Sequence, residues 1–346
     1  MNILRQPLLS LCALLGLGLL LGGCQTSAPR PTAVEYNGTP LPSIMGLQQE
    51  FLSQPDVMTR YLRLSELEAQ ALALAADEPL RLGSVGSAIL EIYPASYTGH
   101  FVLEKFYRDL ESTDAQQLHA AWLRHLRNTT VGEADGSTDA PYKLMSINDA
   151  RAFLAMQGWL ETGALYQSNA ETPLGLTMLA RENAQAPLRT RQFDLSSILR
   201  PLTEDLAGAQ TIQPNNPWPL LRELASSKNS AAQASIGTFL AKQRRFDAAL
   251  SWLEVAARPG NLFANSLLAR IYWFKAGSAQ KQEPQQNPAE SDDQQPTAQE
   301  FKQLALENHL QAIALGSADS MYTLGRLYIE EFFGPTNNAE GIALLE

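Results

Sequence analysis

Apolar residues recur at helical spacing in several segments after residue 44. Between 103 and 110 the large apolar residues stand at positions i, i+3, i+4 and i+7, which is the spacing of one buried helical face. The segment 118–126 follows the same rule, and a third helix is predicted over 149–160, with Asn148 or Asp149 as its N-cap. These patterns predict a mostly helical region over residues 44–206.

Residues 173–195 follow a different pattern. Leu174, Leu176 and Met178 alternate with small or polar residues, 182–184 suits a turn, and alternation resumes over 189–193. A period of two is typical of a half-buried strand, so this stretch predicts a β-hairpin. The hairpin would be a minor strand component of the helical region.

The first residues have the pattern of an export signal. Arg5 precedes an apolar stretch from Leu8 to Leu21, and two glycines then precede Cys24. This order is typical of a signal peptide over residues 1–23. The stretch is short and glycine-rich for a membrane span, although an uncleaved anchor helix is the alternative.

The run Leu-Gly-Gly-Cys at 21–24 resembles the lipobox of bacterial lipoproteins. The resemblance implies cleavage before Cys24, acylation of Cys24 and attachment to a membrane through the lipid. Several acyl chains on one residue hold stably, because each buried methylene contributes ~0.8 kcal/mol. By the family's sorting rule, Gln25 in place of Asp implies the outer membrane of the bacterial envelope, facing the periplasm. Cleavage removes Cys12, so the mature chain would have no thiol for redox chemistry.

Two proline-rich stretches divide the chain. Residues 24–43 are rich in Pro, Ser and Thr, a composition that favours an extended tether. Residues 207–225 hold prolines at 214, 217 and 219 beside two asparagines, which should end any helix. We expect this second stretch to be a linker between the 44–206 domain, which resembles no family, and the rest of the chain.

The C-terminal third contains an internal repeat. Gly237 is matched by a small residue 32 positions later, at Ala269, and again at Gly325. A second set recurs 56 positions on: Ala249, Ala256 and Gly260 correspond to Ala305, Ala312 and Gly316. A repeat of about 34 residues, with an insert of about 22 residues within one repeat, explains both spacings. The insert, 277–299, is rich in Gln and is predicted to be a disordered loop.

A repeat length in the low to middle thirties of residues, with two helices in each repeat, predicts an α-solenoid. The segments Leu324–Tyr328 and Ala248–Leu253 resemble Sel1-like repeats, which are related to tetratricopeptide repeats, and the resemblance covers 226–346. It implies stacked helix pairs that present an extended surface to another protein. The small residues would let paired helices approach closely. Four aromatic residues are predicted to fill the core beside them: Phe239, Trp252, Tyr272 and Tyr328.

Composition narrows the possible partners. The chain has 346 residues and 45% hydrophobic residues, enough to bury a sizeable core. Its formal charge is −10, and no basic block interrupts the acidic balance. We therefore expect that the protein does not bind nucleic acid.

Motifs that carry chemistry are missing from the predicted mature chain, so no catalytic, cofactor or metal site is predicted. His119 and His125 lie six residues apart, on different sides of a helix, and cannot share a metal. His125 and His309 are predicted to be core or half-buried residues with satisfied hydrogen bonds. His100 has the one loop-like setting among the histidines. The Gly- and Ser-containing segment 82–87 is predicted to connect two helices.

The leading hypothesis is a non-enzymatic scaffold or assembly factor, which binds another envelope protein through the repeats. Arg270 and Arg326 occupy equivalent repeat positions and, if stacked, would form a basic ladder for a carboxylate-bearing partner. The alternative is an envelope hydrolase acting on peptidoglycan or polysaccharide, with its site in 44–206, where His100 would meet Glu104 or Asp109.

A third hypothesis is a carbohydrate-binding module that binds sugar through Trp122 or Trp159. The chain also stops at Glu346, within a repeat. Because the last unit of a solenoid normally has a polar cap, we expect either a truncated sequence or an end covered by a partner or a second copy.

Overall fold

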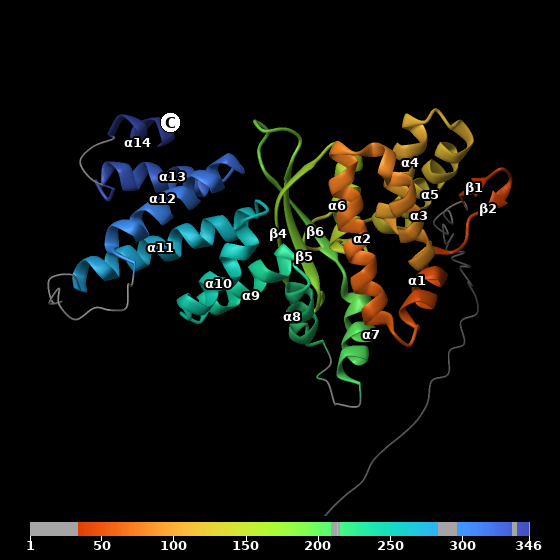
Figure 1. The fold of residues 1–346 in the computed structure, drawn as a ribbon, viewed down its shortest axis with the longest axis horizontal. Coiled ribbons are helices and arrows are strands. Elements are labelled where there is room, and N and C mark those ends of the chain that lie inside the picture. Colours follow the sequence, from red (N-terminus) through yellow and green to blue (C-terminus); the bar gives the residue numbers. More distant parts are fainter. Residues whose placement is uncertain (1–33, 209–212, 214, 283–295, 334–337, 346) are drawn as a thin grey trace, which may run out of the picture. The chain divides into compact units, whose positions relative to one another are not determined.

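The computed structural model describes residues 34–208, 213, 215–282, 296–333 and 338–345. Within these residues the chain is mainly helical with a small sheet, as the sequence predicts (Figure 1). The predicted signal peptide and Cys24 lie outside them. None of the described helices is both long and apolar enough to cross a membrane.

The end of the predicted tether is folded. Strands β1 (Glu35–Tyr36) and β2 (Thr39–Pro40) form a small antiparallel hairpin. The hydroxyl of Tyr36 donates a hydrogen bond to the carbonyl oxygen of Asp114, 2.9 Å away. The expected extended segment therefore ends before residue 43, because this contact ties the hairpin to the helical body.

Helices form most of the region from 44 to 156. They are α1 (Ile44–Leu52), α2 (Val57–Asp77), η1 (Pro79–Arg81), α3 (Leu82–Ile92), α4 (Tyr97–Asp109), α5 (Thr113–Val131) and α6 (Ile147–Met156). The helices predicted at 103–110 and 118–126 are confirmed as parts of α4 and α5. Helix α6 begins two residues earlier than predicted, because Ser146 is its N-cap, and it ends at Met156.

The segment 82–87 is part of helix α3, so the predicted connection is wrong. Its glycines serve helix packing. A Cβ atom on Gly83 would lie 2.6 Å from the Phe106 ring, and one on Gly86 would lie 2.6 Å from Leu103. Both contacts are with α4, so the two glycines let α3 and α4 pack closely.

A four-stranded sheet follows, with strand order β3-β6-β5-β4. The strands are β3 (Tyr142–Lys143), β4 (Leu160–Gln167), β5 (Gly175–Arg181) and β6 (Arg189–Asp194). The antiparallel pair β5–β6 confirms the predicted hairpin. Strand β4 was not predicted: the helix expected over 149–160 overlaps it only at Leu160, and no element was assigned to 161–167. It pairs with β5 alone and forms one edge of the sheet.

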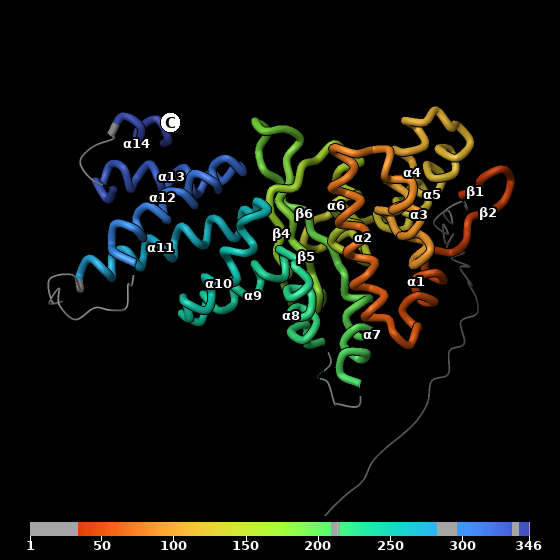
Figure 2. Tube along the Cα trace, viewed as in Figure 1, coloured from red at the N-terminus to blue at the C-terminus, as the bar shows by residue number. Residues whose placement is uncertain are grey.

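The remaining helices reach the end of the described chain. They are α7 (Ser196–Ala207), α8 (Trp218–Ser226), α9 (Ser230–Lys242), α10 (Phe246–Ala257), α11 (Leu262–Gln282), α12 (Ala298–Ala314), α13 (Ala318–Ile329) and α14 (Asn338–Leu345). Helix α9 packs on α10, α11 on α12 and α13 on α14, and Figure 2 shows the chain reversing between the members of each pair.

Two boundaries differ from the prediction. Residues 218–226 are helical, so the linker expected over 207–225 is shorter than predicted. The ends of the predicted Gln-rich loop also belong to helices, since α11 continues to Gln282 and α12 begins at Ala298. The middle of that loop, 283–295, lies outside the described residues.

Positions that correspond in the sequence repeat have similar surroundings. Gly260 and Gly316 both have positive φ angles, 91° and 100°. A Cβ on Gly237 would lie 2.6 Å from the Leu253 side chain, and one on Gly325 would lie 2.9 Å from the carbonyl oxygen of Gly341. The small residues therefore allow close helix contacts, as predicted. Four corresponding alanines are fully buried: Ala249, Ala256, Ala305 and Ala312.

One predicted core aromatic is not in the core. Tyr272 is buried and Trp252 and Tyr328 are half-buried, but Phe239 is 39% exposed. Phe239 points away from the α9–α10 contact and lies beside Trp218, with ring centroids 4.3 Å apart. The exposed Phe239 and the half-buried Trp218 form part of the groove described below.

The sheet and the C-terminal helices share packing and hydrogen bonds. Leu220 and Ile236 belong to the same hydrophobic cluster as the N-terminal helices. The backbone N–H of Tyr166 donates to Ser235 Oγ at 2.8 Å, and Asn261 Nδ2 donates to the carbonyl oxygen of Ala164 at 2.8 Å. Strand β4 is thus fixed directly to α9 and to the start of α11.

Candidate functional site

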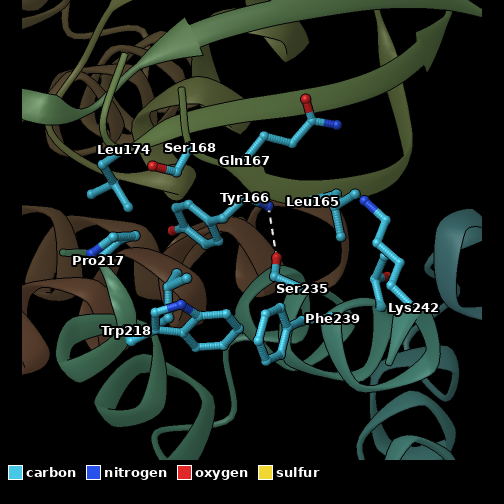
Figure 3. Close-up of a pocket in the computed structure, with 12 residues that line it drawn as sticks. Leu165, Tyr166, Gln167, Ser168, Leu174, Pro217, Trp218, Ser235, Phe239 and Lys242 are labelled. Carbon is cyan, nitrogen blue, oxygen red and sulfur yellow. Dashed lines mark hydrogen bonds between the residues drawn. The ribbon is translucent and has the colours of Figure 1, made fainter. Parts of the chain in front are cut away.

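A groove runs between strand β4 and the C-terminal helices. Its first part is a pocket of about 390 Å³ between the end of β4, the start of α8 and one face of α9 (Figure 3). Trp218 and Phe239 form one wall, and Leu165 and Leu174 contribute further apolar surface. Figure 3 shows the two aromatic rings side by side below the strand.

Local structure explains why Trp218 is at this position. Pro217 is the N-cap of α8, and Trp218 and Pro219 open the helix, which is the place in a helix where proline is best tolerated. The first turn of α8 thereby holds Trp218 against Phe239 of α9. Two of the prolines that predicted a linker, Pro217 and Pro219, instead begin a helix that positions an aromatic side chain.

The second part of the groove lies between α9 and α11 and has a volume of about 640 Å³. Trp273 and Phe274 on α11 line it and are 42% and 56% exposed. The two parts share Leu165, Thr238 and Lys242, so they form one continuous groove. Exposed aromatic residues at this density are typical of a binding surface.

The charges in the groove are sparse and mostly positive. Lys242 and Arg270 line it, with Asp319 at the far end. Over the described ranges neither Lys242 nor Arg270 forms an ion pair. Arg326 pairs with Glu330 on its own helix at 2.7 Å. Of the two predicted partner-binding arginines, Arg270 thus lines the groove, while Arg326 forms an exposed ion pair and is not among the groove residues.

Two histidines form a buried pair that the sequence analysis missed. The Nδ1 atoms of His100 and His119 lie 2.9 Å apart, and His100 Nε2 lies 2.9 Å from the carbonyl oxygen of Pro94. Trp122 stacks on His100, and Tyr107 stacks on His119. Burial lowers the pKa of His100 to about 3 and that of His119 to about 4, so both rings are neutral near pH 7.

The arrangement expected for the hydrolase is not formed. His100 lies in helix α4, not in a loop, and its two ring nitrogens contact His119 and Pro94. Glu104 instead accepts a hydrogen bond from Gln116 at 2.9 Å. Both ring nitrogens of His100 are therefore engaged inside the protein.

The other two histidines differ from each other. His125 Nε2 lies 2.9 Å from the carbonyl oxygen of Pro42. His309 is buried, as predicted, and burial lowers its pKa to about 4. The prediction that His309 is satisfied is wrong, because neither ring nitrogen has a hydrogen-bond partner among the described residues.

Glu68 and Asp149 form a second buried titratable cluster. Ser96 and Ser146, the N-caps of α4 and α6, donate to the Glu68 carboxyl group at 2.8 and 2.7 Å. The N–H of Thr98 donates to Asp149 at 2.9 Å. Burial raises the pKa of Asp149 to about 6 and that of Glu68 well above its usual value. The pair joins α2, α4 and α6, and two helix N-termini favour its negative charge.

The tryptophans proposed for sugar binding already contact other side chains. Trp122 stacks on His100 with centroids 4.7 Å apart. The Arg191 guanidinium lies 4.7 Å from the Trp159 ring centroid, and that of Arg189 lies 5.6 Å away. For metals, the described part of the chain brings together no group of three or more His, Cys, Asp or Glu side chains.

Comparisons with known proteins do not assign the chain. No family model matches it, and no curated protein and no solved structure is significantly similar to it.

Proposed function

We propose that this protein is a lipid-anchored scaffold or assembly factor of the bacterial cell envelope, which binds another envelope protein through its C-terminal helices. The observation that carries the proposal is the groove along β4, α9 and α11, because it combines exposed aromatic residues with two cations that lack ion pairs among the described residues. Such surfaces are where binding energy is concentrated in protein interfaces.

Helices α9–α14 are proposed to be three tandem Sel1-like repeats, each made of one helix pair. The support is that corresponding positions share burial and backbone conformation, as at Gly260 and Gly316. The N-cap positions also correspond, since Asn229 and Ser317 each accept a hydrogen bond from the backbone three residues on. In a solenoid the first helices of successive repeats line one face. Helices α9 and α11 hold these places along the groove.

Attachment to the outer membrane through Cys24 rests on the lipobox resemblance. The first prediction is that Cys24→Ser gives a precursor that keeps its signal segment and does not incorporate labelled palmitate, because the sulfur atom is the acylation site. Wild-type protein expressed in parallel is the control. Undiminished palmitate labelling of the variant would refute the lipid anchor.

The second prediction tests the groove as the partner-binding surface. The double variant Arg270→Ala/Arg326→Ala should capture several-fold less partner from solubilised envelopes, because it removes the groove cation Arg270. Arg326, which lies outside the groove, is changed with it because the two arginines occupy equivalent repeat positions. Its melting temperature should change little, since both side chains are exposed.

A matched control is the double variant Arg60→Ala/Arg200→Ala. It also removes two exposed arginines, each paired within its own helix at i,i+4. Partner capture by this control should equal that of the wild type. Lowered stability with intact capture in the first variant would show that Arg270 and Arg326 are structural residues.

A further inference from the structure

Strand β4 is the edge of the sheet that faces the groove. The residues of β4 that face the neighbouring strand are set by the register, which pairs Leu165 with Thr177 and Gln167 with Gly175. The N–H of Tyr166 points to the opposite side, because it donates to Ser235. Two helix residues, Ser235 and Asn261, thus satisfy part of the outer edge.

The last part of this edge has backbone groups without such partners. In an extended strand the N–H and C=O of one residue point to the same side, and the residue two positions on points there too. The C=O of Tyr166 and the N–H of Ser168 are therefore directed to the groove side. Among the described residues no hydrogen-bond partner is found for either group, and the chain becomes exposed at Gln167.

The apolar pocket begins next to these groups. Tyr166, Gln167 and Ser168 line it together with Trp218 and Phe239. Lys242 extends from α9 toward β4 at the other side of the pocket (Figure 3). An edge N–H and C=O, an aromatic pocket and a cation thus face one space.

We propose that this end of β4 binds an extended segment of the partner protein as a short added strand. The segment pairs its backbone with the C=O of Tyr166 and the N–H of Ser168, and it seats one large apolar side chain on Trp218 and Phe239. A carboxylate on the same segment lies near Lys242. This inference rests on the proposed scaffold function and names the chemistry of its partner.

An extended peptide fits these features better than other occupants do. A donor and an acceptor two residues apart on one strand edge match the backbone of a second strand, which is the basis of recognition by strand addition. Lys242 and Arg270 line the groove and form no ion pair with other described residues, so their charges favour an acidic segment.

The probe is a library of random octapeptides displayed on phage, selected on the full-length chain in detergent micelles. We expect selected peptides to share a large apolar residue and an acidic residue, and binding of the synthetic peptides is measured by fluorescence anisotropy. Phe239→Ala should weaken binding at least about tenfold. The matched control is Val255→Ala on α10, because Val255 is equally exposed at 39% but lies outside the groove.

Charge and backbone are tested separately. Lys242→Glu should weaken binding, whereas Lys143→Glu makes the same change at an exposed position of β3 and should not. Ser168→Pro removes the edge N–H together with the side-chain hydroxyl, at an exposed position whose predecessor is already extended. It should weaken binding about fivefold, while Ser168→Ala, which keeps the N–H, should not. N-methylation of the peptide at alternate residues should have the same effect as Ser168→Pro.

Three outcomes would overturn the inference: selection of no peptide, binding that Phe239→Ala leaves intact, or binding indifferent to both Ser168→Pro and N-methylation. Self-association of the chain that Phe239→Ala abolishes, measured by light scattering, would assign the groove to a second copy and also overturn it. If partner capture needs Arg270 but not the edge of β4, the scaffold proposal stands and this inference alone fails.

Discussion

Acid should destabilise the protein through the buried pair of His100 and His119. The folded state lowers the pKa of His119 from 6.5 to about 4, because the imidazolium would lose its hydration between α4 and α5. Because folding lowers the His119 pKa, the free energy of unfolding has its full value above pH 6.5 and falls as the pH decreases toward 4. The unfolded chain then binds a proton that the folded chain excludes.

The size of the effect follows from the two pKa values of His119. Each pH unit between them costs about 1.4 kcal/mol, so His119 alone should lower the free energy of unfolding by about 2.5 kcal/mol between pH 7.5 and pH 4.5. His100, whose pKa falls to about 3, acts in the same direction. The combined loss is a large fraction of the ~5–15 kcal/mol that holds a typical domain together.

The perturbation is His119→Asn, whose amide can keep a donor near the position of Nδ1 without titrating. Urea unfolding followed by circular dichroism gives the free energy of unfolding of wild type and variant at pH 7.5 and pH 4.5. Other groups titrate in this range, but the contributions of those that do not contact His119 cancel in the difference between the two proteins. The variant should gain about 2.5 kcal/mol relative to wild type on going to pH 4.5.

A control and a refuting result complete the test. Gln117→Asn changes an exposed neutral side chain on the same helix, so its difference from wild type should not depend on pH. If the His119→Asn and wild-type curves are parallel between pH 4.5 and 7.5, His119 does not titrate differently on folding. The assignment of a neutral buried pair would then be wrong.

Two further predictions concern helix packing and the buried acids. Gly237→Ala should destabilise the protein by about 1–3 kcal/mol, because the new Cβ would lie 2.6 Å from Leu253. The same change at Gly277, where nothing lies within 4 Å of the new atom, should stabilise it by up to about 1 kcal/mol, and thermal melts compare the two. Folding raises the pKa of Glu68, so the free energy of unfolding of the wild type should fall by about 1.4 kcal/mol per pH unit above pH 4.5, as the unfolded chain ionises. Glu68→Gln should remove this fall. Equal slopes for variant and wild type in chemical unfolding would contradict a neutral Glu68 beside Asp149.

Local pattern was enough to predict the helical class and the β5–β6 hairpin. The apolar spacing over 103–110 and 118–126 lies within α4 and α5, since a helix that buries one face must repeat its apolar residues every three to four positions. The small residues at Gly237 and Gly325 likewise marked close helix contacts, because only a missing side chain lets two backbones approach. Information of this kind is contained in a few neighbouring residues.

Contacts between distant residues could not be predicted in this way. His100 and His119 lie on different helices, and Glu68 and Asp149 are 81 positions apart in the chain. Strand β4 was not predicted, because a short buried run has no alternation to reveal its period. The groove also depends on contacts between residues that are far apart in the chain. Trp218 and Phe239 come from separate helices, and β4 lies beside them only because the sheet is held there by Ser235 and Asn261. Tertiary packing, and not local preference, therefore decided which aromatic residue is core and which lines the candidate site.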